Sequence, residues 1–237
     1  MKVFFILISL LFLVSCAQNS AKNLSVLSPE SKVFVVSLLG DKLVVDHKAT
    51  TVFGNYNIIE DVSQWNMNQY IDSFVSSQGR VSGKFKYIEN APPNNELRQK
   101  GQDFVNGEIK EKQYRAYLSD FAEKIGADLI ILLEPIGFEA RKWDPVAKSG
   151  YVIHQRSAFG KKSSSLEVSI NMFVLDTKNE KQIAYEYSSG YSDTKSYWFL
   201  EKEAISGDVK QSLEAEVKGL LDRVLLMGIS DFGLVKK

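Results

Sequence analysis

The chain has 237 residues, of which 44% are hydrophobic and 11% aromatic, so it is long enough to bury a sizeable core in one domain or two small ones. Its 29 basic and 29 acidic residues give a formal net charge of zero, which argues against a large electrostatic surface for nucleic acid. The single cysteine excludes a disulfide within the chain.

The N-terminus has the layout of a secretion signal that ends at the cysteine. Lys2 precedes an apolar run from Val3 to Val14, whose helical length of about 18 Å is shorter than the roughly 30 Å hydrocarbon core of a bilayer. Leu13-Val14-Ser15-Cys16 resembles the lipobox of bacterial lipoproteins, which implies that Cys16 is lipidated and that residues 1–15 are removed. The alternative is an ordinary signal peptide followed by an incidental cysteine.

The residues after Cys16 indicate a location and a tether. In Gram-negative lipoproteins an aspartate after the lipidated cysteine retains the protein in the inner membrane, so Ala17 implies the outer membrane, with the domain facing the periplasm. Residues 16–32 are small and polar and predict a lipidated, flexible tether. No other apolar run approaches eighteen residues, so the lipid is expected to be the only membrane anchor. Residues 33–237 are expected to form a single α/β domain.

The first part of this domain predicts a hairpin followed by a helix. Residues 33–39 form a β-rich run, and residues 43–45 are interpreted as its hairpin partner across Gly40-Asp41. Asp61 or Ser63 is expected to cap a helix that runs to about residue 77. Apolar side chains at helical spacing mark its buried face: Met67, Tyr70, Ile71, Phe74 and Val75.

The middle of the chain predicts a second helix that leads directly into a buried strand. Residues 85–89 are interpreted as a strand, whereas residues 96–111 are polar and show no decisive pattern. The next helix ends at Gly126 and has an apolar face made of Tyr114, Tyr117, Leu118, Phe121 and Ile125. Residues 127–136 follow with five consecutive large aliphatic side chains, which is typical of a strand covered on both faces.

The last part predicts three antiparallel strands and a long helix. The strands are expected at residues 151–159, 166–176 and 182–189, the first two joined by a turn at residues 160–163. Asp208 is expected to cap a helix whose buried face carries Val209, Leu213, Val217, Leu220, Leu221 and Val224. The order β-β-α-β-α-β-β-β-α predicts an α/β (α+β) fold, with one mixed sheet of about five to six strands and three helices packed against it.

Two segments carry a resemblance to a known superfamily. One is the helix end and strand from Phe121 to Leu132, which contains Gly126-Ala127-Asp128, and the other is the strand from Ile170 to Lys178, which closes on Asp176-Thr177-Lys178. Together they resemble the small α/β domain of the curli-secretion lipoprotein, of the lipoprotein activators of penicillin-binding proteins and of the N-terminal part of the Tol translocation protein. Both segments are structural in those families, so the resemblance implies a fold and no catalytic residue.

Residues with catalytic or metal-binding chemistry are few. The two histidines, His47 and His154, have neither a helix-spaced partner nor a neighbouring cysteine, and we interpret both as structural or surface residues. Glu60 and Asp61 are sequence neighbours, whereas a catalytic carboxylate pair must converge in a cleft. We therefore expect no catalytic residue, no metal and no cofactor.

Aromatic residues are the candidates for partner binding. Tyr185 and Tyr187 share one face of a strand and are expected to be core or half-buried. The consecutive side chains of Tyr197, Trp198 and Phe199 cannot all point inward, and Trp143 lies in a charged loop at residues 137–150. Exposed tyrosine and tryptophan side chains are favoured anchors at protein interfaces.

These observations favour a membrane-tethered envelope lipoprotein that acts as a non-catalytic binding or adaptor domain for another envelope component, most plausibly a protein. Two alternatives stay open. In the first, the chain would be a cell-envelope hydrolase that uses carboxylates in a cleft. In the second, it would be a structural subunit of an envelope assembly. Convergent carboxylates with perturbed pKa values would favour the enzyme, and an exposed aromatic patch would favour the adaptor.

Overall fold

The computed structural model describes residues 28–83, 85–88, 95–136, 149–179, 181–194, 197–200 and 205–234. Its strands are β1 (Lys32–Ser37), β2 (Lys42–Ala49), β3 (Tyr56–Asp61), β4 (Lys86–Tyr87), β5 (Leu129–Pro135), β6 (Tyr151–Ala158), β7 (Lys161–Asp176) and β8 (Lys181–Asp193). The helices are α3 (Met67–Ser82), α4 (Asn95–Val105), α5 (Glu111–Ile125) and α6 (Gly207–Asp231), with short 3-10 turns η1 (Val52–Gly54) and η2 (Ser63–Trp65). None of these described helices is long and apolar enough to span a bilayer.

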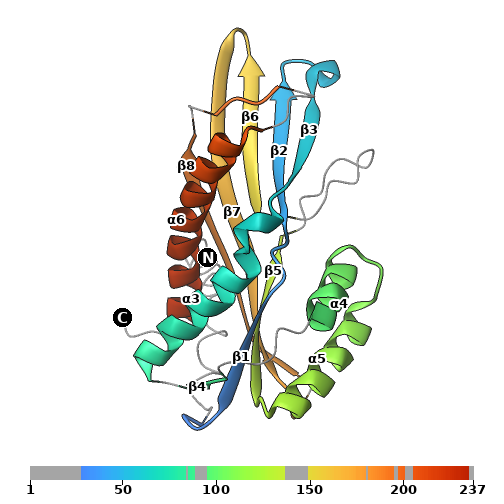
Figure 1. Cartoon of the computed structure of the whole chain (residues 1–237), viewed down its shortest axis with the longest axis vertical. Coiled ribbons are helices and arrows are strands. Elements are labelled where there is room, and N and C mark those ends of the chain that lie inside the picture. Colours follow the sequence, from blue (N-terminus) through green and yellow to red (C-terminus); the bar gives the residue numbers. More distant parts are fainter. Residues whose placement is uncertain are drawn as a thin grey trace, which may run out of the picture.

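The eight strands form one mixed sheet with an unusual division along its length (Figure 1). The long strand β7 pairs with β8 along one edge, and its other edge is shared by two strands. Residues 161–168 of β7 pair with β6, and residues 170–176 pair with β5. Beyond them, β2 pairs in parallel with β6, and β1 pairs in parallel with β5. The sheet therefore has a lower half (β4, β1, β5) and an upper half (β3, β2, β6), joined by β7 and β8.

The predicted fold class is confirmed, although the structure has more elements than the sequence predicted. The described chain contains eight strands and four α-helices, against the expected five to six strands and three helices. The additional helix is α4, within the polar residues 96–111 that showed no decisive pattern. Leu97 and Val105 of α4 are buried, and two apolar side chains are enough to dock a short helix that neighbouring elements already support.

The predicted hairpin of residues 33–39 with residues 43–45 is wrong. After β1 the chain does not reverse, because the Leu38 N–H donates to the Leu133 carbonyl oxygen at 2.8 Å and continues the ladder between β1 and β5. Gly40 has φ +81°, a left-handed conformation that bends the chain without turning it back. The chain then enters β2, which pairs with β3 and β6 instead of with β1.

The predicted start of the first helix is also wrong, whereas its buried face is confirmed. Asp61 ends β3, and its carboxylate accepts a hydrogen bond from the Ser63 N–H at 2.8 Å within the turn that leads to η2. The helix begins at Met67, and Met67, Ile71 and Val75 lie in the core as predicted. The capping chemistry of Asp61 therefore serves a turn before the helix.

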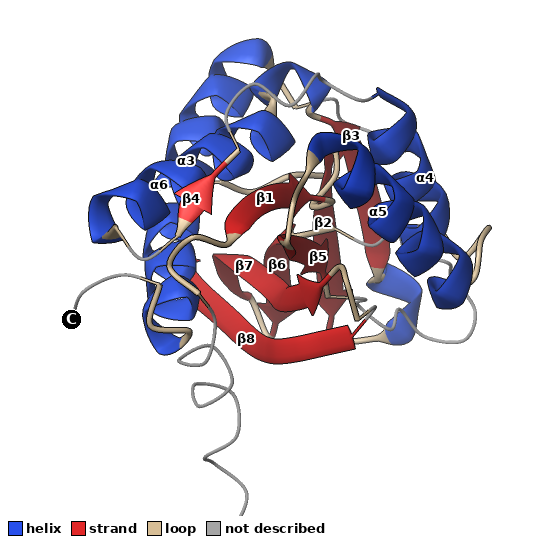
Figure 2. Ribbon diagram, turned by 90° about the horizontal axis from the view of Figure 1, so that it is seen from below, coloured by secondary structure: helices blue, strands red, loops and turns tan. Residues whose placement is uncertain are grey.

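Two apolar cores cover opposite faces of the sheet (Figure 2). The larger core lies between the sheet and helices α3 and α6, and it extends over both halves of the sheet. The smaller core lies between α4 and α5 and the lower half, where it is built from alternate residues of β1 and β5 such as Val36 and Ile130. The lower half is thus covered on both faces, as the unbroken apolar run of β5 predicted.

The two segments that carry the superfamily resemblance meet in space at the lower end of the sheet. Leu129 of β5 pairs with Asp176 of β7, and the Thr177 hydroxyl donates to the carbonyl oxygens of Ala127 and Asp128 at 2.9 Å each. Asp128 forms an ion pair with Lys178 at 2.7 Å and accepts a hydrogen bond from the Lys32 N–H at 2.9 Å. Gly126 ends α5 with φ +68°, as predicted. Both segments are structural in this chain.

Candidate functional site

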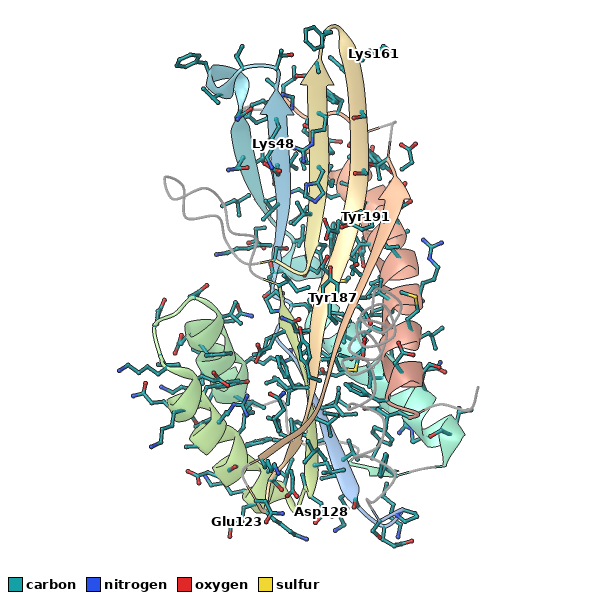
Figure 3. The ribbon with its side chains drawn as sticks, turned by 180° about the vertical axis from the view of Figure 1, so that it is seen from behind. Lys48, Glu123, Asp128, Lys161, Tyr187 and Tyr191 are labelled. Carbon is teal, nitrogen blue, oxygen red and sulfur yellow. The ribbon has the colours of Figure 1, made fainter. Side chains whose placement is uncertain are left out.

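The upper half of the sheet has one face on which no described helix packs, and we call this surface the open face. It lies on the same side of the sheet as α4 and α5, which cover only the lower half (Figures 1 and 3). Strand register and alternation place the following side chains on it: Asp46, Lys48, Ile59, His154, Arg156, Ser165, Glu167, Tyr187, Tyr191 and Asp193. Most of these side chains are polar, so the open face contrasts with the apolar face behind it.

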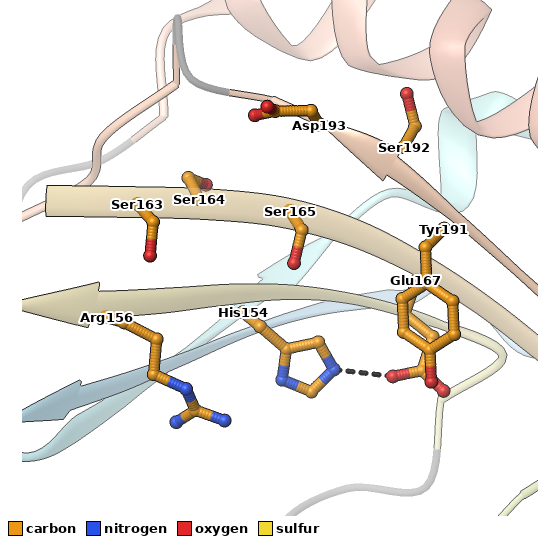
Figure 4. Close-up of a pocket in the computed structure, with 9 residues that line it drawn as sticks. All are labelled: His154, Arg156, Ser163, Ser164, Ser165, Glu167, Tyr191, Ser192 and Asp193. Carbon is orange, nitrogen blue, oxygen red and sulfur yellow. Dashed lines mark hydrogen bonds and ion pairs between the residues drawn. The ribbon is translucent and has the colours of Figure 1, made fainter.

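A network of ionisable side chains lies on the open face, and its contact between His154 and Glu167 is drawn in Figure 4. The imidazole Nε2 of His154 lies 2.7 Å from Oε2 of Glu167, and its Nδ1 lies 3.5 Å from Oδ2 of Asp46. The Ser169 hydroxyl donates to the other carboxylate oxygen of Glu167. Burial would raise the pKa of Asp46, but hydrogen bonds from His154 and Lys48 outweigh burial and hold that pKa below its usual value. Asp46 is therefore ionised at neutral pH.

This network is not arranged for hydrolysis. Ser165 lies opposite His154 in the strand register and is the serine nearest to it along the paired strand. However, each ring nitrogen of His154 already faces a carboxylate, so neither is directed to take a proton from Ser165. The lowered pKa of Asp46 also does not suit the general acid of a glycosidase, which needs a raised pKa. The network instead holds ionisable side chains in fixed positions on the sheet.

Tyr187 and Tyr191 of β8 project from the open face beside this network, whereas Tyr185 lies on the same side of the sheet opposite Phe173 in the lower half. Tyr185, Tyr187 and Tyr191 are 42%, 48% and 62% exposed. The Tyr185 hydroxyl donates to Oδ1 of Asn171 at 2.9 Å. Burial and a hydrogen bond to Glu167 raise the pKa of Tyr191 to about 12, so its hydroxyl stays protonated. Tyrosines held in this way offer a large amphipathic contact area with little rotamer freedom left to lose.

Of the two alternatives predicted for Tyr185 and Tyr187, core or half-buried, the structure excludes the core and leaves both side chains about half exposed. The close approach of α6 decides this orientation of β8. The face of β8 under α6 carries small residues, including Ala184, Ser188 and Gly190. A Cβ atom at Gly190 would lie 2.8 Å from Val224 and 2.9 Å from Leu220, so no bulky residue fits there. The tyrosines occupy the alternate positions and therefore point to the opposite side of the sheet.

A shallow hollow of about 620 Å³ lies on the open face between β6, β7 and β8 (Figure 4). Its lining includes His154, Arg156, Glu167, Tyr191 and Asp193. The hollow therefore offers a guanidinium, carboxylates and an aromatic ring within one depression, which is suited to a polar side chain or backbone segment of a partner. No group of three or more acidic, histidine or cysteine side chains suitable for a metal occurs in the described part of the chain.

The aromatic residues proposed from the sequence lie elsewhere. Tyr197 and Trp198 are half-buried, and Phe199 is only 9% exposed and belongs to the larger core. The Trp198 ring lies edge-on to His47 at 5.2 Å, and His47 stacks on Tyr56 at 4.3 Å. The Tyr56 hydroxyl donates to the Phe199 carbonyl oxygen at 2.6 Å. These contacts hold the segment against the face of the sheet opposite to the open face.

Two other predicted residues, Cys16 and Trp143, lie outside the described residues. The histidines were expected to be structural or surface residues, and the structure places them on opposite faces of the sheet, His47 with the aromatic residues and His154 in the charged network. A signal for this network was present in the sequence. Asp46, His154 and Glu167 each interrupt an apolar strand at a position that alternation assigns to the face away from the larger core.

Comparisons with known proteins find similarity only among solved structures. No family model and no curated protein matches the chain. Lipoprotein GNA1162 from Neisseria meningitidis has 13% sequence identity and a TM-score of 0.33, over 81% of this chain and 99% of that one. The PelC dodecamer from Paraburkholderia phytofirmans has 8% identity and a TM-score of 0.33, over 86% and 90%. The LpoB C-terminal domain from Salmonella enterica has 9% identity and a TM-score of 0.26, over 73% and 95%.

Solved structures similar to this chain thus include a bacterial lipoprotein. Since none of these TM-scores reaches 0.5 and all identities lie below 25%, no conclusion about the function of this chain rests on them.

Proposed function

We propose that this chain is a lipid-anchored protein of the bacterial envelope whose α/β domain binds another envelope protein through the open face. The observation that carries the proposal is the row of exposed tyrosines on β8 beside the hydrogen-bonded network of Asp46, His154 and Glu167. Tyrosine and arginine are enriched at the energetically dominant positions of protein interfaces. A rigid sheet also presents these side chains without an entropic cost of ordering a loop.

The anchoring part of the proposal rests on the sequence. Leu13-Val14-Ser15-Cys16 supports lipidation of Cys16, and Ala17 supports placement in the outer membrane with the domain towards the periplasm. Each buried methylene of an acyl chain contributes about 0.8 kcal/mol, so two or three chains anchor a protein stably. Residues 28–32 belong to the described domain, so the proposed tether is residues 17–27, which at about 3.3 Å per residue would span about 36 Å when extended and let the domain reach a partner away from the bilayer surface.

A photo-crosslinking amino acid at position 187 tests the binding surface. We expect this variant, expressed in cells, to form a discrete crosslinked product whose second protein is identified by mass spectrometry. The matched control carries the same amino acid at position 81, an exposed site on α3 away from the open face. The proposal is wrong if position 187 gives no product, or if position 81 gives the same product with equal yield.

The Cys16→Ala variant tests the anchor separately. We expect loss of metabolic labelling by fatty acid and loss of the protein from the membrane fraction as a processed form. If labelling and fractionation are unchanged in this variant, the lipobox interpretation is wrong. This result would leave the crosslinking at position 187 unaffected, so the two parts of the proposal fail independently.

A further inference from the structure

The upper end of the sheet carries two neighbouring loops with exposed apolar side chains, and we call them the two-loop tip. One is the turn at Phe159 and Gly160 between β6 and β7, and the other is the loop with η1 between β2 and β3. Phe53, Phe159 and Val52 are 96%, 92% and 64% exposed. The loops are adjacent because Ala49 pairs with Ser157, and the Thr50 hydroxyl donates to the Ser157 carbonyl oxygen at 3.3 Å.

The backbone at Phe159 is unfavourable for a phenylalanine. Ala158 pairs with Lys161, so Phe159 and Gly160 form a two-residue hairpin turn, with φ +49° and +75°. Both values lie in the left-handed region, where such turns strongly prefer Asn, Asp or Gly, and a bulky side chain is disfavoured there. Phe159 is also almost fully exposed, so burial of its ring does not compensate within the fold. A costly side chain with no packing role indicates a role outside the folded domain.

Basic residues surround these apolar side chains. Residues 48–57 and 155–164 contain Lys48, Arg156, Lys161 and Lys162 and no acidic residue, although the whole chain has no net charge. Asp46 offsets part of this charge through its ion pairs with Lys48 at 3.2 Å and with Arg156 at 3.9 Å, whereas Lys161 and Lys162 lie at the turn itself. Lys162 lies 4.8 Å from the ring centroid of Trp198, a contact that leaves its positive charge in place. The two-loop tip therefore carries both exposed apolar and basic side chains, of which Lys48 and Lys161 are labelled in Figure 3.

We propose that the two-loop tip binds the surface of an anionic phospholipid bilayer, with Phe53 and Phe159 inserted at the headgroup level. Aromatic side chains partition into the interfacial region of a bilayer, and lysine and arginine are attracted to anionic headgroups. The charge of the tip complements an anionic lipid surface, and the two rings enter without rearrangement because they are already exposed. This contact goes beyond the proposed protein-binding function and uses neither the tyrosines of the open face nor Cys16.

The tip lies at the end of the sheet opposite to the start of the domain. Lys32 begins β1 at the lower end beside Asp128, whereas Lys48 and Lys161 lie towards the upper end (Figure 3). The chain that follows a lipidated Cys16 would therefore join the domain at one end of the sheet. The tip would bind the membrane at the other end. Membrane binding by the tip is an additional contact, and it can be measured in a chain without the lipid.

Vesicle sedimentation tests the proposal on the chain from residue 16 to residue 237 with Cys16→Ser, which retains every described residue. The vesicles contain either phosphatidylglycerol and phosphatidylethanolamine in a 3:7 ratio or phosphatidylcholine alone. We expect binding to the anionic vesicles that is at least tenfold tighter than to the neutral ones and that weakens with added salt. Equal binding to both, or no binding to either, would overturn the proposal.

Variants separate the contribution of the phenylalanine rings to vesicle binding from that of the lysine charges. We expect the double substitution Phe53→Ser with Phe159→Asn to weaken binding to anionic vesicles at least tenfold, and Lys161→Gln with Lys162→Gln to weaken it several-fold and reduce its salt dependence. Val81→Ser removes an equally accessible apolar side chain from α3 and should leave binding unchanged. A thermal unfolding midpoint at or above that of the parent chain shows that the Phe159→Asn substitution preserves the fold.

Unchanged vesicle binding by the double phenylalanine variant would exclude the tip as the membrane contact. A photo-crosslinking amino acid at position 53 gives a further outcome. If it captures a protein in cells while the purified chain does not bind vesicles, the tip is a protein-binding site and the proposal is wrong. Either result leaves crosslinking from position 187 on the open face as an independent observation.

Discussion

The lower and upper halves of the sheet are joined by the same two strands, β7 and β8, but differ in how they are covered. In the lower half, every residue from Leu129 to Leu133 of β5 is buried, because α3 and α6 cover one face and α4 and α5 cover the other. In the upper half, β6 begins buried and ends at exposed Arg156 and Ala158. The change occurs along β7, which runs through both halves. The lower half is therefore covered by helices on both faces, whereas described helices cover only one face of the upper half.

The junction between the halves is held by polar contacts, some of them fully buried. The Tyr151 hydroxyl donates to the carbonyl oxygen of Gly40, where the chain passes from β1 to β2. Ser37 donates to Asn68 of α3 at 2.9 Å, and Asp72 of α3 lies 3.6 Å from Arg98 of α4. Helices from opposite faces of the sheet thus meet at this point. The following predictions test the difference between the two halves, starting with the largest expected effect.

Ile130→Ala tests the role of the doubly covered half. Ile130 is buried against α5 in the smaller core, so the substitution removes apolar contacts and leaves a cavity. We expect the free energy of unfolding in urea to fall by about 2–5 kcal/mol. A loss below about 1 kcal/mol would mean that α4 and α5 contribute little to the stability of the lower half.

Asp72→Asn tests the junction through its pH dependence. Although 27% of its side chain is exposed, burial among α3, α4 and β1 raises the pKa of Asp72 to about 8, against the opposing charge of Arg98. A carboxyl group whose pKa is higher in the folded state than its usual value of about 4 stabilises the fold only while it is protonated. Its contribution is complete below pH 4 and is lost as the pH rises through 8.

We therefore expect Asp72→Asn to raise the free energy of unfolding by about 1–3 kcal/mol at pH 8 and to change it little at pH 4. Urea unfolding at both pH values measures this difference. Arg98→Gln is the matched control and should act in the opposite direction at pH 8, since it removes the charge that partly stabilises the Asp72 carboxylate. Equal destabilisation by Asp72→Asn at the two pH values would contradict the assignment.

Phe159→Asn tests whether the upper end is optimised for something other than stability. Asparagine tolerates the left-handed conformation that Phe159 adopts, and the phenyl ring makes almost no compensating burial. We expect the free energy of unfolding to rise by about 1 kcal/mol, measured by thermal unfolding. Phe53→Ser is the control, because Phe53 does not have a positive φ and its replacement should leave stability unchanged.

Tyr187→Ser has the smallest expected effect on stability. Its side chain is about half exposed on the open face, so the free energy of unfolding should change by no more than about 0.5 kcal/mol. The same substitution should reduce recovery of the envelope partner in co-purification from cells. A large loss of stability with normal partner recovery would make Tyr187 a structural residue.

The elements that were predicted correctly are those that local periodicity describes. The buried faces of α3, α5 and α6 contain the residues that helical spacing selected, and α5 ends at Gly126. Alternation in β7 identified Leu166, Val168, Ile170, Met172 and Val174 as core residues. The prediction that the five consecutive aliphatic residues of β5 form a strand buried on both faces was also confirmed.

The predictions that were incorrect or left two alternatives concern partners in space. Two short apolar runs separated by Gly40-Asp41 are compatible with a hairpin or with a chain that continues in the same direction past a bend. Only the pairing of β1 with β5 and of β2 with β6 shows that the chain continues. The orientation of Tyr185 and Tyr187 depends on how closely α6 approaches Gly190. Neither contact leaves a trace in the local pattern of residues.

By itself, the sequence determined the helix faces, the buried central strand and the α/β class, since hydrophobic periodicity is a local property of each segment. It also contains the only basis for the predicted lipid anchor at Cys16. The tertiary structure alone decided which face stays open, that Asp46, His154 and Glu167 meet on it, and that Phe53 and Phe159 lie at one tip. Those residues come from distant strands, and strand pairing is selected by the total packing of the sheet instead of by the residues of any one strand.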